Sequence, residues 1–353
     1  MTRPARVIVD TSALKFNLSV VRHHAPGAKV MAIVKADGYG HGVHRVGKAL
    51  ADTDAFGVAS IEEAISLREG GISNPVVLLE GPFERREIAL IRDYGLETVV
   101  HTDEQLSMIA SEKCAAPLWI KLDSGMHRLG FQPHDLPRIL ESLRGQSNTV
   151  RCMTHLANAH HREDENTPNQ IARFNTAIEA FQGETSIANS AGVLAWSEST
   201  GDWVRPGIML YGISPFNEQC GADLGLRPAM TVKSALISVR QIGAGESVGY
   251  GRGFVSESAM TVGVIAFGYG DGYPRAAGTD TPVLVNGQRT RVIGEASMDM
   301  LTVDLSGIRN PQVGDEVTLW GPELPVELIA KSANTIPYEL VCRVRMRARY
   351  VDS

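Results

Sequence analysis

Polar and charged residues with catalytic potential stand at the ends of short apolar runs in the first two-thirds of the chain. The run "VMAIV" (30–34) is followed by Lys35, and other runs lead to a histidine, an arginine or a second lysine. The residues in such positions are Lys35, Tyr39, Lys121, Asp123, Arg128, His155, Asn189, Ser190, Arg205, Gly207 and Ile208. An amine, an imidazole, guanidinium groups and Ser/Gly segments suited to phosphate form a coherent set.

Lys35 indicates covalent chemistry with a carbonyl compound. A lysine amine can form a Schiff base with an aldehyde. Pyridoxal phosphate supplies such an aldehyde, and with it a sink for the electrons of an amino acid's Cα. Its phosphate needs backbone N–H donors and a hydroxyl, which the segments "NSAG" (189–192) and "RPGI" (205–208) can provide. The prediction depends on this convergence, because a single lysine at a strand end is more often a surface residue.

Other patterns in the sequence carry less information. The glycine-rich segments "GYGHG" (38–42), "GYGRG" (249–253) and "GYGDG" (268–272) match neither the dinucleotide fingerprint nor the P-loop. We interpret His160 and His161 as a solvated loop pair, because no third ligand has suitable spacing. We therefore expect no metal site.

The elements that must position these residues alternate between buried strands and helices. Eight short apolar runs recur, and helix-like segments such as "SIEEAISLREGG" follow most of them. Strands buried on both faces and alternating with helices imply a parallel sheet. Eight such units within about 220 residues favour a closed (β/α)8 barrel of the TIM type, whose chemistry lies at the carboxyl ends of the strands. An open doubly wound sheet remains the alternative.

The sequence pattern changes near residue 226, where β-rich runs replace the alternation of strand and helix segments. Runs such as "MTVKSALISVRQI" and "TPVLVNGQRTRVI" are separated by Gly, Pro and Asp turns. We therefore assign residues 1–225 to the barrel and residues 226–353 to a second, mostly β domain. The barrel so defined includes the opening strand "RVIV" and a helix over "DTSALKFNLSVVRHH", with Asp10, Thr11 or Ser12 as its N-cap.

Composition excludes several classes of protein. The chain has 353 residues, 43% of them hydrophobic, and a net charge of −6, which argues against nucleic acid or an anionic membrane as the main partner. The amino-terminal residues contain no apolar segment of the secretory type, and no run approaches the length of a membrane span. We expect a soluble cytoplasmic protein.

The segment "AIVKADGYGHG" closely resembles the cofactor-lysine signature of alanine racemases, pyridoxal-phosphate enzymes that combine a barrel with a β domain. The resemblance extends through nearly the whole chain. The family's segments appear in order as "IKLDSGMHRLGF", "MTHLANA", "NSAG", "RPGIMLYG", "VGYGRGF", "FGYGDGYPR", "SMDM" and "PYELVCRV".

The resemblance implies a role for each matching residue. Lys35 would hold the cofactor as an aldimine and act as acid and base on one face, and Tyr250 of a partner subunit would act on the other. Arg205 would face the pyridine nitrogen, with His155 between Arg205 and Tyr250. The remaining matches divide into the substrate side, with Arg128, Met298, Asp299 and Tyr269; the phosphate side, with Tyr39, Asn189, Ser190, Gly207, Ile208 and Tyr338; and Lys121, which the family often carbamylates.

Elementary chemistry agrees with these roles. Inverting a stereocentre through a planar carbanion needs a proton acceptor on each face, so Lys35 requires a second group such as Tyr250. A guanidinium is donor-only and stays charged, so a pyridine nitrogen facing Arg205 must remain unprotonated. That arrangement weakens the electron sink and limits side reactions. The departure at Glu295, where the family often has arginine near the substrate entrance, puts the gating contacts in question but not the chemistry.

The favoured hypothesis is a homodimeric alanine racemase with shared active sites, which supplies D-alanine for peptidoglycan or serves alanine catabolism. One rival is an amino-acid decarboxylase of similar architecture, against which Arg205 argues. Another is a non-catalytic carrier of pyridoxal phosphate, which would leave Tyr250 and the β domain without a purpose. A third is a racemase of wider range that acts on serine or basic amino acids.

Overall fold

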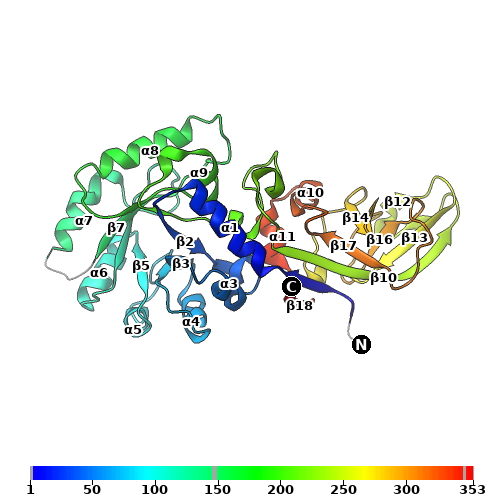
Figure 1. Ribbon diagram of the computed structural model, residues 1–353, viewed down its shortest axis with the longest axis horizontal. Coiled ribbons are helices and arrows are strands. Elements are labelled where there is room, and N and C mark those ends of the chain that lie inside the picture. The colour runs from blue at the N-terminus through cyan, green and yellow to red at the C-terminus, as the bar shows by residue number, and fades with distance from the viewer. Residues whose placement is uncertain (1–2, 145–148, 345–346, 353) are drawn as a thin grey trace. The chain divides into compact units, whose positions relative to one another are not determined.

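The structure is a computed structural model that describes residues 3–144, 149–344 and 347–352, and the chain divides into two compact units (Figure 1). The barrel unit comprises Lys15–Leu210 with Pro215–Glu218. The β unit comprises Met1–Leu14, Tyr211–Ser214 and Gln219–Ser353.

Eight parallel strands of the described residues close into a barrel, which confirms the predicted (β/α)8 architecture. Each predicted apolar run forms one strand, and the central strands are fully buried because helices cover their outer faces. The strands are β2 (Lys29–Ile33), β3 (Ala55–Val58), β4 (Val76–Leu78), β5 (Glu97–Val100), β6 (Leu118–Lys121), β7 (Val150–Met153), β8 (Thr185–Ser186) and β9 (Trp203–Val204). β9 pairs with β2 to complete the ring.

Helices follow the strands and carry the start signals expected from the sequence. Ser60 caps the helix predicted in "SIEEAISLREGG", and Thr102 caps the helix after β5. The barrel unit contains α2 (Lys35–Tyr39), α3 (Val43–Ala49), α4 (Ile61–Glu69), α5 (Glu87–Asp93), α6 (Asp103–Ser111), α7 (Leu136–Ser142), α8 (Asn166–Ala177) and α9 (Ser190–Ala195). In α1 (Thr11–His24), Asp10 is the N-cap, since its carboxylate accepts the N–H groups of Ser12 and Ala13 at 2.8 and 3.0 Å.

A long strand, β10 (Met230–Ile242), organises the β unit (Figure 1). Its first half pairs with β1 (Arg6–Val9) and β17 (Glu316–Trp320), and its second half, beyond a bulge at Leu236–Ser238, pairs with β13 (Met260–Ile265). The other elements are β11 (Ser247–Val248), β12 (Phe254–Val255), β14 (Pro282–Val285), β15 (Gln288–Arg291), β16 (Leu301–Asp304), α10 (Val326–Ser332), α11 (Pro337–Arg343) and β18 (Arg349–Asp352).

The unit boundary differs from the expected division at residue 225. The opening strand "RVIV" is β1, and it belongs to the β unit, where it lies between β10 and β18. The physical reason is pairing: β1 runs antiparallel to β10 and parallel to β18, so its hydrogen bonds are made with strands that come more than 200 residues later. The two short helices α10 and α11 also lie in a region that the sequence predicts to be mostly β.

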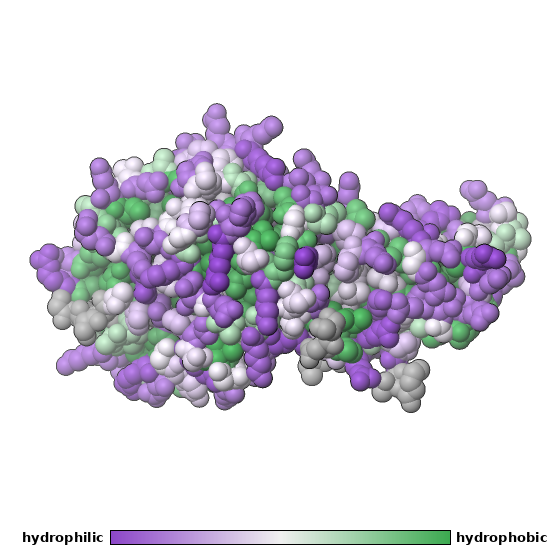
Figure 2. Space-filling view, in the orientation of Figure 1, coloured by the Kyte–Doolittle hydropathy of each residue, from purple (hydrophilic) through white to green (hydrophobic). Residues whose placement is uncertain are grey.

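Hydrophilic side chains cover most of the face of each unit that Figure 2 presents. Among the helices of the described residues, none has the length and apolar character needed to span a bilayer. Nor do those residues contain a group of three or more His, Cys, Asp or Glu side chains arranged to hold a metal ion.

Candidate active site

Lys35 stands at the carboxyl end of β2 and opens a turn of unusual conformation. The next four residues, Ala36–Tyr39, have φ between 51° and 61°, the left-handed region that costs a non-glycine residue about 1 kcal/mol. Glu63 on α4 holds this turn, since its carboxylate accepts the Ala36 N–H at 2.7 Å and the Ala59 N–H at 2.8 Å. Such strain is characteristic of functional sites.

Four further cationic or basic groups surround the same end of the barrel as Lys35. Lys121 ends β6 and is only 9% exposed. Burial, followed by the positive charges of Arg205, Arg128 and Lys35, lowers the pKa of Lys121 to about 8. The structure thus brings together the strand-end cations that the sequence predicted, and their mutual repulsion makes this end of the barrel suited to an anionic ligand.

His155, just beyond β7, belongs to the same cluster. Burial, and then the charges of Arg205, Lys121, Arg128 and Lys35, lowers its pKa well below the usual range. The ring is therefore neutral near pH 7, with one nitrogen that donates a hydrogen bond and one that accepts.

Arg205 is 4% exposed, and its guanidinium donates to neutral acceptors. It donates to Ser186 Oγ at 2.5 Å, to the Ile187 carbonyl at 3.3 Å, and to the Thr154 carbonyl. Burial lowers the pKa of Arg205 to about 10. These contacts fix the direction of the guanidinium.

A compact cradle lies where α9 begins and β9 ends. Ser190 Oγ accepts the Gly207 N–H at 2.9 Å and the Met209 N–H at 3.4 Å. A Cβ on Gly207 would lie 2.7 Å from the Tyr39 hydroxyl, so only glycine permits this approach. The hydroxyls of Ser190 and Tyr39 thus both lie against the backbone at Gly207, and hydroxyls and backbone N–H groups are the donors that a phosphate needs.

Asn189 serves the fold of this region. Its side chain caps α9 by accepting the Gly192 N–H at 3.0 Å. It therefore positions Ser190, the first residue of that helix.

Arg128 lies in an exposed loop that Asp123 shapes. The Asp123 carboxylate accepts the N–H groups of Gly125, Met126 and His127 at 2.9 to 3.0 Å. Although burial raises the pKa of Asp123, these hydrogen bonds outweigh it and hold the pKa below its usual range. The loop is thereby ordered up to the residue before Arg128.

Tyr250 in the β unit stands at the tip of the hairpin formed by β11 and β12 and is 72% exposed. Glycines with positive φ flank it, Gly249 at 72° and Gly251 at 64°, which explains the "GYGRG" spacing. The hairpin rests on an apolar cluster that includes Val248 and Ile293. The base of the hairpin is therefore anchored while the aromatic tip remains uncovered.

Tyr269 and Met298 are also exposed, by 38% and 54%, and lie on neighbouring segments of the β unit. Backbone hydrogen bonds join Tyr269 to Ser297 at 3.0 Å and Gly270 to Met298 at 2.8 Å. Asp299 follows directly, and Tyr338 lies on α11, where burial raises its pKa.

Comparison with known proteins decides the family. The model of the alanine racemase N-terminal domain matches residues 9–215, and that of the C-terminal domain matches residues 229–351. The chain belongs to the alanine racemase family. It is therefore an amino-acid racemase. It is 47% identical to the alanine racemase of Vibrio vulnificus strain CMCP6 over 350 residues, 98% of both proteins.

Solved structures of family members agree over the whole chain. The biosynthetic alanine racemase of Pseudomonas aeruginosa is 41% identical, with a TM-score of 0.97 and full coverage of both chains. The alanine racemase of Bartonella henselae, determined with covalently bound pyridoxal phosphate, is 28% identical with a TM-score of 0.90 and 99% coverage of both.

Two residues near this racemase's cation cluster are not singled out by the sequence patterns above. Glu80, beyond β4, partly offsets the lowering of the pKa of Lys121. Its carbonyl lies 2.9 Å from Nε2 of His101, which follows β5. The sequence does carry a signal for them, because both are polar residues directly after predicted strands.

Proposed function

We propose that this chain interconverts L-alanine and D-alanine with bound pyridoxal phosphate. The observation that carries the proposal is the convergence of Lys35, Lys121, Arg128, His155 and Arg205 at the carboxyl ends of the barrel strands, next to the Ser190–Gly207 cradle. A cluster of cations beside a cradle of N–H and hydroxyl groups fits a ligand that carries a phosphate and an aldehyde.

The cofactor would be held at both of its ends. Lys35 would attach it covalently, and Tyr39, Ser190, Gly207, Ile208 and Tyr338 would bind its phosphate. When bound, pyridoxal phosphate supplies a sink for the electron pair left at the amino acid's Cα after proton removal. Arg205 is fixed by neutral acceptors and has only donors, so it would hydrogen-bond the pyridine nitrogen in its unprotonated form.

Two bases would exchange the Cα proton from opposite faces. The Lys35 amine would act on one face, and the Tyr250 phenol of a second copy of the chain on the other. A phenol can take up a proton at neutral pH only after its anion has been stabilised by neighbouring donors. His155, neutral and next to Arg205, would donate to that anion.

The amino acid would be bound through its carboxylate. Arg128 would bind the carboxylate of the amino acid, together with the backbone N–H of Met298, while Asp299 and Tyr269 would line the approach. Because the pKa of Lys121 is about 8, a fraction of its side chain is a neutral amine near pH 7. That amine would add to CO2 with loss of a proton, and the resulting carbamate anion would orient Arg128.

The proposed assembly is a homodimer with shared active sites. Its support is the exposure of Tyr250, Tyr269 and Met298 on the β unit, since a second copy would cover these large side chains. The enzyme would act in the cytoplasm, supplying D-alanine for peptidoglycan or serving alanine catabolism.

The test is an incubation of the purified protein with pyridoxal phosphate and L-alanine in D2O. Cα deuteration is followed by NMR, and the enantiomers are separated on a chiral column. Deuterated D-alanine is the expected product; Lys35→Ala should abolish it together with the visible absorbance of bound cofactor. Lys48→Ala, at an exposed lysine of α3, serves as the control.

The other outcomes separate the rivals. Release of CO2 from the amino acid would support a decarboxylase. Unlabelled L-alanine with normal cofactor absorbance would support a carrier or a racemase for another amino acid.

A further inference from the structure

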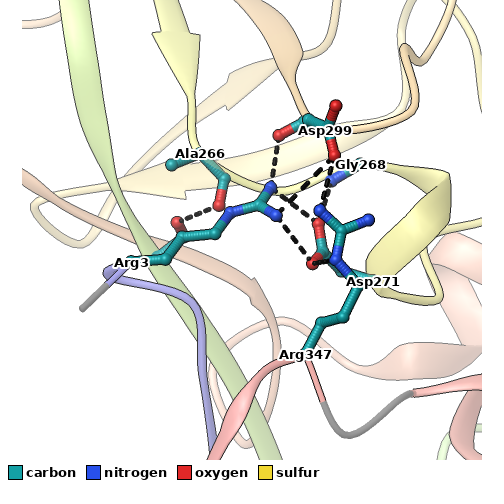
Figure 3. Close-up of polar contacts among 7 residues, drawn as sticks. Arg3, Ala266, Gly268, Asp271, Asp299 and Arg347 are labelled. Atoms are coloured by element: carbon teal, nitrogen blue, oxygen red, sulfur yellow. Dashed lines mark hydrogen bonds and ion pairs between the residues drawn. The ribbon is translucent and has the colours of Figure 1, made fainter.

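A network of two arginines and two aspartates joins the ends of the chain to the loops that carry Tyr269 and Met298 (Figure 3). We call Arg3, Arg347, Asp271 and Asp299 the terminal arginine network. The parallel pairing of β1 with β18, in which Arg6 lies opposite Arg349, brings together the segments that carry the two arginines. The function proposed above assigns no role to either arginine.

Asp271 is the buried centre of the network. Its carboxylate is fully buried and accepts two N–H groups of Arg3 at 3.0 and 2.8 Å. It also accepts the Gly268 N–H at 2.9 Å, and Nε of Arg347 lies 3.6 Å away. Because a buried carboxylate requires partners of this kind, Asp271 ties the turn 268–272 to Arg3.

The turn 268–272 lies directly against the segment that carries Met298. Besides the backbone hydrogen bonds of Tyr269 and Gly270, the contact is close enough that a Cβ on Gly268 would lie 2.3 Å from the Ser297 carbonyl. The "GYGDG" segment is thus a packing motif, in which glycine lets one loop lie on another. An interaction that orders the turn 268–272 therefore also orders the segment that carries Met298.

Arg347 acts on both loops from the solvent side. It is 44% exposed and donates to Asp299 at 2.5 Å, next to Met298. A Cβ on Gly270 would lie 2.3 Å from the Arg347 guanidinium, so this side chain lies on the turn itself. Arg3 reaches the same segment through a hydrogen bond to the Asp299 carbonyl.

We propose that Arg3 and Arg347 are positioning residues for substrate binding, which hold the Met298 backbone and the Tyr269 ring in the place where the amino acid is bound. The proposal rests on the proposed function, in which Met298 and Tyr269 contact or admit the substrate. A preorganised loop loses less conformational entropy on binding, so the network increases affinity for substrate in the ground state and the transition state alike. Loss of an interaction that stabilises both states equally raises KM and leaves kcat unchanged.

Arg347→Gln in the holoenzyme tests this role, because Arg347 is partly exposed while Arg3 supports a buried carboxylate. KM for both alanine enantiomers should rise about two- to five-fold with kcat nearly unchanged, the factor that corresponds to the loss of an exposed ion pair. Arg347→Lys should recover part of the loss, since it keeps the charge without the planar fork. Cofactor absorbance should stay at the wild-type level.

Hydrogen exchange followed by mass spectrometry gives a readout that does not depend on activity. In Arg347→Gln, the backbone amides of residues 268–272 and 296–300 should exchange faster, because their mutual hydrogen bonds are no longer clamped. Arg291→Gln is the matched control. Arg291 is similarly exposed, also bridges two aspartates, Asp280 and Asp304, and lies in β15 of the same unit.

Gly270→Ala provides a second route should Arg347→Gln fold poorly. It keeps every charge, but its Cβ would lie 2.3 Å from the Arg347 guanidinium and 3.0 Å from the Met298 carbonyl, so it disturbs the packing of both against the turn and should raise KM in the same direction. Unchanged KM and unchanged exchange in these variants would overturn the proposal, as would a loss confined to kcat. Failure of the wild-type protein to racemise alanine would instead refute the proposed function. The exchange experiment would still show whether the terminal arginine network orders the two loops.

Discussion

Replacing Lys121 by methionine should make the cofactor-free protein more stable at neutral pH. Methionine has a similar length but no charge, and the site is 9% exposed. Burial and the charges of Arg205, Arg128 and Lys35 lower the pKa of Lys121 from 10.5 to about 8. The folded protein therefore carries an ammonium that its surroundings disfavour.

The size of the effect follows from this difference in pKa. The shift from 10.5 to about 8 corresponds to at most about 3 kcal/mol, at 1.36 kcal/mol for each unit. Below pH 8 the amine is charged in both states, and the folded state bears the full cost. Between pH 8 and 10.5 only the unfolded chain keeps the proton, so the stability of the wild-type protein rises with pH. Above 10.5 the cost is gone, and so is the advantage of Lys121→Met.

Thermal unfolding measures this, with both proteins free of cofactor, at equal concentration and in CO2-free buffer from pH 7 to 10.5. For a unit of this size about 1 kcal/mol shifts Tm by about 2–4 °C, so the variant should melt several degrees higher at pH 7. Lys48→Met, at an exposed lysine of α3, should show no such pH-dependent gap. Bicarbonate should narrow the gap, because a carbamate replaces the ammonium. A variant no more stable at pH 7, or a gap that persists at pH 10.5, would refute the reasoning.

Two further substitutions test the cradle and the opposite end of the barrel. Gly207→Ala should weaken cofactor binding by about 1–3 kcal/mol, because its Cβ would lie 2.7 Å from the hydroxyl of the buried Tyr39; a cofactor titration by absorbance checks this. Arg151→Met should destabilise the barrel by about 3 kcal/mol, since it removes the cation that lies 3.1 Å from Glu97 and 2.6 Å from Glu184. Burial raises the pKa of Glu184, but hydrogen bonds from Lys29, Trp203 and Arg151 outweigh this effect and lower the pKa from 4.5 to about 2. The difference in unfolding free energy between the wild-type protein and Arg151→Met should therefore decrease as the pH falls from 4.5 to 2, which acid-unfolding curves measure.

The sequence is informative wherever a local pattern has one structural meaning. A run such as "AFGV" that alternates with helical segments is typical of a strand in a parallel sheet covered on both faces, and β3 is fully buried. Polar residues after such runs must meet at one end of a barrel, which is why the strand pattern by itself groups Lys35, Lys121 and Arg205.

Long-range pairing is beyond the reach of these patterns. The strand "RVIV" has no local mark of its partners, so its place between β10 and β18 becomes evident only in the folded chain. The basic segment "RVRMRARYV" has no local explanation for the same reason: the role of Arg347 depends on Asp271 and Asp299, which lie far away in the sequence. The left-handed turn at Ala36–Tyr39 likewise contains Ala36 and Tyr39, residue types that local propensity would not place there.

The two ends of the barrel show how similar residues can serve stability or function. At the amino ends of the strands, Arg151 lies between two glutamates and over the rings of Trp119 and Trp203, at 5.2 and 5.6 Å, so its charge is matched. At the carboxyl ends, burial and mutual repulsion lower the pKa of Lys121, and Arg205 bonds to neutral acceptors. Folding alone gains nothing from such a cluster of like charges. An anionic cofactor would offset the repulsion when it binds, so binding and stability should increase together.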